Sequence, residues 1–295
     1  MYRRKIAFLL AAVVLFSISA AAQANFDNEL TQYLSQRYKK RMMILRRFYM
    51  GEQLKYDPSG NLIGHADEGF WTINGILQIN KIRVSNQRLE IQAKRFVLAE
   101  IKNKLDFAPS KRETVIVVDF DPRNFTREVV DAALSQIFFN EHDHFEELVP
   151  IYWKHCVMAA ATGGGGKEDD YCHYSDRFLT LAAVRFTSGP FTPHQVDGSV
   201  ERIVVASMRP PKQLYAPDPQ YSIDARDANA EGIVKLNLVV GSNGTPRDIW
   251  IRKPVGYGLD ELAIATVETW KFSPALKNGT PVSVVVTVEV NFHLH

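Results

Sequence analysis

The sequence lacks an excess of charge of either sign and lacks the short motifs of common hydrolases. Its 35 Lys and Arg residues are nearly balanced by 33 Asp and Glu residues, so the composition does not point to nucleic acid as a partner. Neither Gly-x-Ser-x-Gly nor His-Glu-x-x-His occurs. Asp119 and Asp121 could pair as catalytic carboxylates, but acids that follow a buried strand more often cap or hydrogen-bond the next helix. We therefore expect no enzyme and no catalytic residue.

Long apolar runs are scarce as well, and the one that stands out lies at the N-terminus. Three basic residues precede Ile6 to Ala22, and this run ends in the small residues of Ala22-Gln23-Ala24. The pattern is typical of an export signal that is cleaved after Ala24. Because the run is at the lower limit for a spanning helix, a retained inner-membrane anchor is the alternative. We predict a signal peptide at residues 1–24 and a periplasmic location.

Cysteine is the scarcest of the reactive residues, with only Cys156 and Cys172 in the chain. Histidines adjoin both cysteines, and a polar stretch lies at 142–146, so a tetrahedral zinc site, free thiols and a disulfide are the alternatives. The spacing fits no standard zinc finger. In an exported chain a Cys156–Cys172 disulfide is favoured, and closing this segment would stabilise the fold by about 3 kcal/mol. We predict this disulfide, no metal and no cofactor.

The composition that remains, 46% hydrophobic and 23% charged, is that of a folded protein. Strand and turn patterns run from Trp71 to Ile91, and Thr114 to Phe120 is apolar enough for a central strand. A helix is expected over residues 125–139, with Thr126 as its cap. These features predict an α+β domain at residues 25–207, which we assign to no family.

An amphipathic helix is expected before these strands. Its apolar face would hold Leu30, Leu34, Tyr38, Met42 and Leu45, and basic residues crowd the remainder. One interpretation is a packed helix with a solvated basic back. The other is attachment to an anionic membrane surface.

The last part of the chain is patterned as a small sheet with one helix. Apolar residues alternate from Val234 to Val240, and Ser242-Asn243-Gly244 favours a tight hairpin that returns along residues 248–251. From Leu259 to Trp270 the apolar residues recur at three- and four-residue steps, which predicts a helix across the sheet.

A second turn and a final strand complete this pattern. Lys277-Asn278-Gly279 is a turn signal, and the β-branched run from Val282 to Phe292 disfavours a helix. The predicted order is strand, strand, helix, strand, in other words a ββαβ fold with an antiparallel sheet.

The same segment carries motifs of a known family. Leu259-Asp260, the run Trp270-Lys271-Phe272-Ser273-Pro274-Ala275, and Asn278-Gly279 with Pro281-Val282 occur in this order before the last strand. With these motifs, residues 215–295 resemble the C-terminal domain of TonB-family energy transducers. The resemblance implies a domain at residues 222–295 that binds the plug of an outer-membrane transporter by strand addition, in energy-dependent transport.

The family's mode of binding points to the last strand as the binding edge. An exposed edge can also pair with a second copy, so a homodimer is an expected competitor, and the family adds inner-membrane motor proteins as further partners. By position, the expected partner-binding residues are Ser283, Val284, Val286, Val288, Val290 and Phe292.

Two features of the chain favour an alternative function. The spacer at residues 208–221 is short and rich in proline, with a reach of about 40 Å at full extension. No histidine lies between Met1 and Gln23, where well-known members of the family carry the histidine that engages the motor. The alternative is a periplasmic protein-binding or scaffold module without energy transduction.

Overall fold

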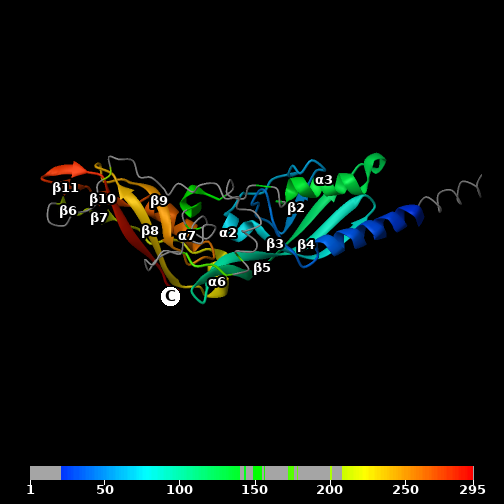
Figure 1. Ribbon diagram of the computed structural model, residues 1–295, viewed down its shortest axis with the longest axis horizontal. Coiled ribbons are helices and arrows are strands. Elements are labelled where there is room, and N and C mark those ends of the chain that lie inside the picture. The colour runs from blue at the N-terminus through cyan, green and yellow to red at the C-terminus, as the bar shows by residue number, and fades with distance from the viewer. Residues whose placement is uncertain are drawn as a thin grey trace, which may run out of the picture. The chain divides into compact units, whose positions relative to one another are not determined.

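The computed structural model describes residues 21–139, 143, 149–154, 156, 172–175, 178, 200 and 208–294 (Figure 1). The chain divides into two compact units. Unit 1 comprises residues 1–69, 75–95 and 112–139, and unit 2 comprises residues 70–74, 96–111 and 140–295. Unit 2 therefore joins the C-terminal segment to stretches from within the predicted first domain.

Five strands form one mixed sheet. In spatial order they are β1 (Met42–Ile44), β3 (Ile76–Ser85), β4 (Arg88–Ile101), β5 (Lys104–Asp119) and β2 (Gln53–Tyr56). β1 pairs antiparallel with β3, whereas β2 pairs parallel with β5. β5 lies between two neighbours, which confirms the central strand predicted over residues 114–120. Asn86 and Gln87 both have positive φ angles, as a tight two-residue turn between β3 and β4 requires.

Two helices complete the core of unit 1. Residues 21–38 are helical, and α3 (Arg127–Ile137) begins after Thr126, whose hydroxyl accepts a hydrogen bond from the Val129 N–H. Leu30 and Leu34 of the first helix are buried in the same core as the apolar side of α3. The Tyr33 hydroxyl donates to Asp131 of α3 at 2.8 Å. The predicted helix with its Thr126 cap is confirmed, and so is the packed-helix interpretation of the N-terminal segment.

Two local predictions in this part of the chain are wrong. The first helix ends at residue 38, because Lys40 adopts a left-handed φ of 66° and donates its N–H to the Ile79 carbonyl at 2.7 Å. Met42 therefore begins β1 instead of extending the helix to Leu45. Trp71–Asn74 form a short helix, α2, and not a strand, since the Asn74 N–H donates back to the Phe70 carbonyl at 2.8 Å.

In the C-terminal segment, the three-stranded sheet and its helix follow the predicted order, and the short strands β10 (Lys271–Ser273), β11 (Ala275–Lys277) and β12 (Thr280–Val282) between them were not predicted. β8 (Gly232–Val240) pairs antiparallel with β9 (Pro246–Lys253) and with β13 (Val284–Phe292), giving the spatial order β13-β8-β9. Between β9 and β13 lies α7 (Leu259–Val267), which buries Leu259, Ala263 and Val267. The predicted α+β class with an antiparallel ββαβ unit is confirmed.

Short strands join the spacer segment to the region after α7. β7 (Lys212–Tyr215) pairs with β10 (Lys271–Ser273), and β6 (Met208–Arg209) pairs with β11 (Ala275–Lys277), which also pairs with β12 (Thr280–Val282). Residues 208–215 are thus extended but hydrogen-bonded, so they are not a free spacer. Asn278 and Gly279 have φ angles of 51° and 83°, as a two-residue hairpin between β11 and β12 requires.

A further helix was not predicted. α6 (Ile223–Ala228) is capped by Ser222, whose hydroxyl accepts a hydrogen bond from the Ala225 N–H at 2.9 Å. Within the described part of the chain, no helix combines the length and hydropathy that crossing a membrane requires. The predicted export signal lies almost wholly outside the described residues.

Candidate functional site: the edge of the C-terminal sheet

β13 lies at one edge of the three-stranded sheet. All nine of its residues pair with β8, from Val284 opposite Val240 to Phe292 opposite Gly232. Among the described residues, no strand pairs with the outer side of β13. Because alternate residues of an antiparallel strand point their N–H and C=O groups away from the neighbour, this side presents a row of unpaired main-chain donors and acceptors.

The predicted contact residues differ in what they expose. Val284, Val290 and Phe292 are core residues with 0%, 2% and 0% of their surface exposed, so a partner could meet them only through their main chain. Val286 and Val288 point to the same side but are half-buried, and Ser283 precedes the strand. The two half-buried valines therefore form an apolar border along the unpaired edge. That a partner binds there stays a prediction.

The opposite face of the strand is polar from Thr287 onward. Thr287 donates to the Asn237 side chain at 2.7 Å and accepts from Arg252 at 3.2 Å. Glu289 forms an ion pair with Lys235 at 3.3 Å across the β8 pairing. Sequence reasoning missed these residues, although the alternation with the valines places Thr287 and Glu289 on the other face of the strand.

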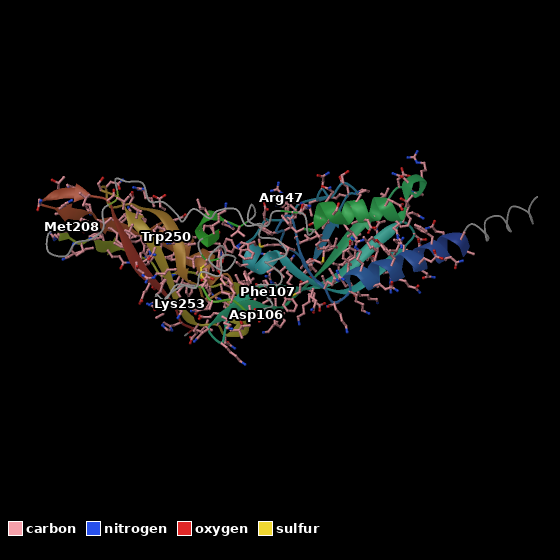
Figure 2. The ribbon with its side chains drawn as sticks, viewed as in Figure 1. Arg47, Asp106, Phe107, Met208, Trp250 and Lys253 are labelled. Carbon is pink, nitrogen blue, oxygen red and sulfur yellow. A yellow bond between two sulfur atoms is a disulfide. The ribbon has the colours of Figure 1, made fainter. Side chains whose placement is uncertain are left out.

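The other edge of the sheet is less regular. In β9, whose Trp250 and Lys253 are labelled in Figure 2, the pairing with β8 shifts register twice. Asp248 of β9 also has a positive φ of 48°. Bulged edges are poor templates for an added strand, whereas β13 pairs without any shift of register. The regular edge is therefore the better candidate site.

α7 supports this sheet and buries two adjacent carboxyl groups. Asp260 accepts hydrogen bonds from the Val255 and Gly256 N–H groups, both at 2.8 Å. Glu261 Oε1 accepts from the Thr72 hydroxyl at 2.6 Å and from Trp153 Nε1 at 2.9 Å. Glu261 Oε2 has no hydrogen-bond partner within the described part of the chain.

Burial controls the titration of this pair. It raises the pKa of Asp260 to about 8, helped by the neighbouring Glu261, against the effect of the two N–H donors. It also raises the pKa of Glu261, against the two donors on Oε1. Burial also raises the pKa of the Tyr152 phenol, and the nearby Glu261 carboxyl group adds to this effect.

A comparison with known families identifies this part of the chain. A model of the family described as "Gram-negative bacterial TonB protein C-terminal" matches residues 217–294. These residues are a TonB C-terminal domain. The motifs from Leu259 to Phe292 that carried the resemblance all lie within the match.

Two similar proteins have been found in Pseudomonas aeruginosa. The chain is 32% identical to its Protein tonB2 over 83 residues, which are 28% of this chain and 31% of that protein. The chain thus spans about a third of the length of this relative. A solution NMR structure of the TonB CTD from the same organism is 20% identical, and the match covers 32% of this chain and 96% of that one. With a TM-score of 0.23, this likeness is too weak to support a conclusion.

Upstream residues pack directly on the TonB C-terminal domain. The Glu100 N–H donates to the Val255 carbonyl at 2.9 Å, and the Tyr257 N–H donates to the Leu98 carbonyl at 2.7 Å. Tyr257 also contacts the small core of Ile73, Val97, Ala99 and Ala108. The domain therefore shares its core with residues of α2, β4 and β5.

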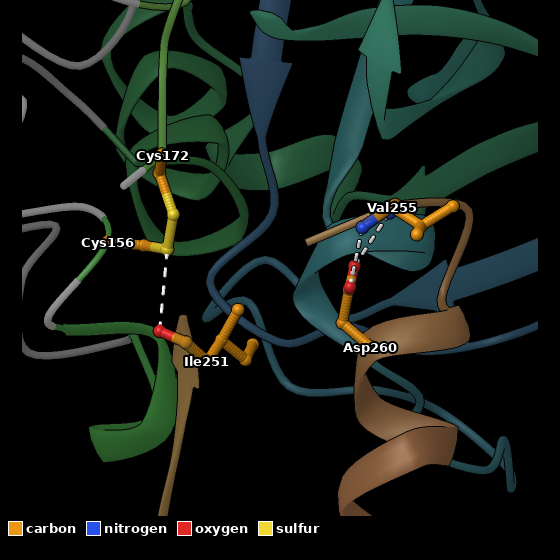
Figure 3. Close-up of a disulfide and its surroundings, with 6 residues drawn as sticks. Cys156, Cys172, Ile251, Val255 and Asp260 are labelled. Carbon is orange, nitrogen blue, oxygen red and sulfur yellow. Dashed lines mark hydrogen bonds between the residues drawn. A yellow bond between two sulfur atoms is a disulfide. The ribbon is translucent and has the colours of Figure 1, made fainter. Parts of the chain in front are cut away.

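A disulfide joins Cys156 and Cys172, with their Cα atoms 5.4 Å apart (Figure 3). Cys156 Sγ lies 3.8 Å from the carbonyl oxygen of Ile251 in β9, and Figure 3 also shows the Val255 N–H donating to Asp260. Residues 142, 144–148 and 155, which include three of the histidines considered as metal ligands, lie outside the described residues.

The two carboxylates considered for catalysis do not form a pair. Asp119 contacts Arg88 at 2.7 Å and Lys55 at 2.8 Å, and these cations lower the pKa of its carboxyl group to about 2. Asp121 caps the 3-10 turn η1 (Pro122–Asn124) by accepting from the Arg123 N–H at 2.9 Å. Both acids have structural partners in unit 1.

Proposed function

We propose that this chain is a periplasmic TonB-type protein that binds an outer-membrane transporter plug, or another envelope protein, by strand addition to β13. In this role it takes part in energy-dependent transport and works as a binding protein, without catalysis. The observation that carries the proposal is the unpaired, regular edge of β13 in a TonB C-terminal domain. Main-chain hydrogen bonds along such an edge supply affinity, and the flanking side chains supply specificity.

The two faces of β13 indicate the kind of segment that would bind. On the core side, Val286 and Val288 are half-buried and would be covered by apolar side chains of an added strand. On the other side, Thr287 and Glu289 would lie next to polar side chains. A partner segment that alternates apolar and polar residues fits this edge, because successive side chains of a strand point to opposite faces.

Site-specific photo-crosslinking in cells tests the proposal. A photo-reactive residue at Thr287 or Glu289 should capture a transporter through its plug. The matched control is the same residue at Lys253, which is exposed on the opposite edge of the sheet. Equal capture from both edges, or capture from neither, would contradict strand addition at β13.

A scaffold module without energy transduction is the second candidate. It is favoured by the pairing of β6 with β11 and of β7 with β10, because these pairings hold residues of the predicted spacer against the C-terminal segment. The two candidates differ in the partner captured from β13, a transporter plug or another envelope protein. The mass of the mature protein separates them further, since loss of residues 1–24 leaves no N-terminal anchor for contact with inner-membrane motor proteins.

A further inference from the structure

Trp153 and Cys156 lie three residues apart in a short helical stretch, so they share one side of it. Trp153 is fully buried, donates its Nε1–H to Glu261 of α7 at 2.9 Å and packs edge-on against Trp71 at 5.8 Å between ring centroids. Cys156 is also buried and contacts the main chain of β9 at Ile251. This stretch therefore covers α7 and β9 of the TonB C-terminal domain.

The other half of the disulfide is held by β5. The Leu105 N–H donates to the His173 carbonyl at 2.6 Å, and the Ser175 N–H donates to the Leu105 carbonyl at 3.0 Å. Phe178 stacks on Tyr174 and on Phe107, with centroid distances of 4.6 Å and 5.4 Å. Cys172 thus begins a segment that is anchored independently of Trp153.

Both anchors belong to unit 2. Leu98 and Glu100 of β4 hydrogen-bond to residues 255–257, directly before α7. β5 pairs with β4 in the same sheet, so Cys172 is fixed to strands that are themselves fixed to the TonB C-terminal domain. A covalent bond from Cys172 to Cys156 therefore restrains the helical stretch that carries Trp153.

We propose that the Cys156–Cys172 disulfide is a redox-dependent strap that holds Trp153 on Glu261 and keeps α7 covered. The disulfide closes a short segment, and such a closure shifts the equilibrium toward the covered state by on the order of a hundredfold. In the reduced chain the burial of Trp153, its hydrogen bond to Glu261 and its contact with Trp71 still hold this stretch on α7, but without the covalent restraint.

Release of the strap would remove a hydrogen bond from the buried Glu261 carboxyl group. When Trp153 leaves, Oε1 keeps only the Thr72 hydroxyl as a donor, and Oε2 already lacks a partner within the described residues. A buried carboxyl group with so few hydrogen bonds is unfavourable, so water should enter around the first turn of α7. The covered state would then be a property of an oxidising compartment, where such disulfides persist.

The chemistry of release is thiol–disulfide exchange. A dithiol reductant transfers two electrons and two protons, the S–S bond breaks to give the Cys156 and Cys172 thiols, and the reductant closes to its own cyclic disulfide. No other co-reactant is needed. A disulfide of higher reduction potential can reoxidise the two thiols to the Cys156–Cys172 disulfide.

Amide hydrogen exchange on the purified full chain, with and without dithiothreitol, tests the strap. Reduction should raise exchange in residues 151–154 and 259–267 by ten- to a hundredfold, while residues 76–95 of unit 1 are unchanged. Unchanged exchange in α7 after complete reduction would overturn the proposal. So would an equal rise throughout both units, because the disulfide would then stabilise the whole fold and not the cover.

Two variants make the test independent of the reductant. Cys172→Ser should show the exchange pattern of the reduced chain, and dithiothreitol should not change it further. Trp153→Phe keeps the disulfide and an aromatic ring but removes the N–H donor, so it should raise exchange in α7 more than at Leu105. A Trp153→Phe chain with wild-type exchange in α7 would show that Trp153 holds nothing there.

Discussion

At the scale of single residues, the pair formed by Asp260 and Glu261 is the most informative feature. Asp260 receives two main-chain N–H donors, which favour a charged carboxylate, whereas Glu261 Oε2 is buried with no partner among the described residues. Two adjacent buried carboxyl groups cannot both ionise cheaply. We therefore expect the pair to keep at least one proton at neutral pH.

This protonation predicts a pH dependence of stability. Burial raises the folded-state pKa of Glu261, and that of Asp260 to about 8, above their unfolded values. Their contribution is fully present below the unfolded pKa values near 4, and it is lost as pH rises through the folded values. The free energy of unfolding should therefore fall toward about pH 8, measured by denaturant titration.

Glu261→Gln isolates the Glu261 share of this slope. The amide oxygen can still accept from Thr72 and Trp153 but carries no titrating proton, so the pH dependence should flatten. Glu268→Gln, at an exposed position after α7, is the control and should keep the wild-type slope. An identical slope in the wild type and in Glu261→Gln would show that Glu261 does not hold the proton.

Two glycines provide a matched test of close packing. Gly256 has a φ of 91°, and a Cβ there would lie 2.3 Å from Ala99 Cα, whereas Gly279 has a φ of 83° with open space around it. Gly256→Ala should cost more than about 3 kcal/mol, and Gly279→Ala about 1 kcal/mol, the cost of the left-handed backbone alone. Thermal unfolding of the two variants measures the difference. Similar losses of stability in the two variants would mean that Leu98 and Ala99 do not pack closely against Gly256 in the turn before α7.

At the scale of elements, helix caps and tight turns were predicted correctly from local signals, whereas pairings between distant segments were not predicted. Thr126 and the spacing that follows it predicted α3, and the Asn-Gly pairs predicted the hairpin of β8 with β9 and the turn between β11 and β12. The pairing of β6 with β11 depends on residues far apart in the chain, so no local pattern could reveal it. The same holds for the end of the first helix, where Ile79 accepts the Lys40 N–H.

The candidate site could also be predicted only in part, because some of its contacts join residues far apart in the chain. Position and family resemblance pointed to the last strand, and its side chains alternate as the sequence indicated. The contacts that cover α7 were not predicted, because Thr72 and Trp153 lie 189 and 108 positions before Glu261 in the sequence. Two adjacent acids, Asp260 and Glu261, on a mainly apolar helix were an available signal, since a buried charge needs partners.

Proline substitution in β13 tests whether its outer edge is open to an added strand. In an antiparallel strand, neighbouring residues point their N–H groups to opposite sides, so one of Thr287 and Val288 donates toward β8 and the other away from it. Proline at the inward position should destabilise the sheet. Proline at the outward position should leave the melting temperature within a few degrees of wild type but abolish partner capture. Equal effects of both prolines on stability and capture would contradict an open edge.

At the scale of the whole chain, the TonB C-terminal domain is not an isolated module. Residues of α2, β4 and β5 share its core, and Trp153 covers its helix. A fragment limited to residues 208–295 should therefore exchange its α7 amides at least tenfold faster than the full chain does, as measured by mass spectrometry. Equal protection in fragment and full chain would show that the upstream residues add nothing to α7.

The central claim is that β13 receives a partner by main-chain pairing. Hydrogen exchange of the β13 amides, resolved residue by residue by NMR with and without the captured transporter, tests it most directly. The account predicts that alternate amides between Val284 and Phe292 gain protection when the partner binds, while those already bonded to β8 keep theirs. Binding that leaves every β13 amide unchanged would contradict it.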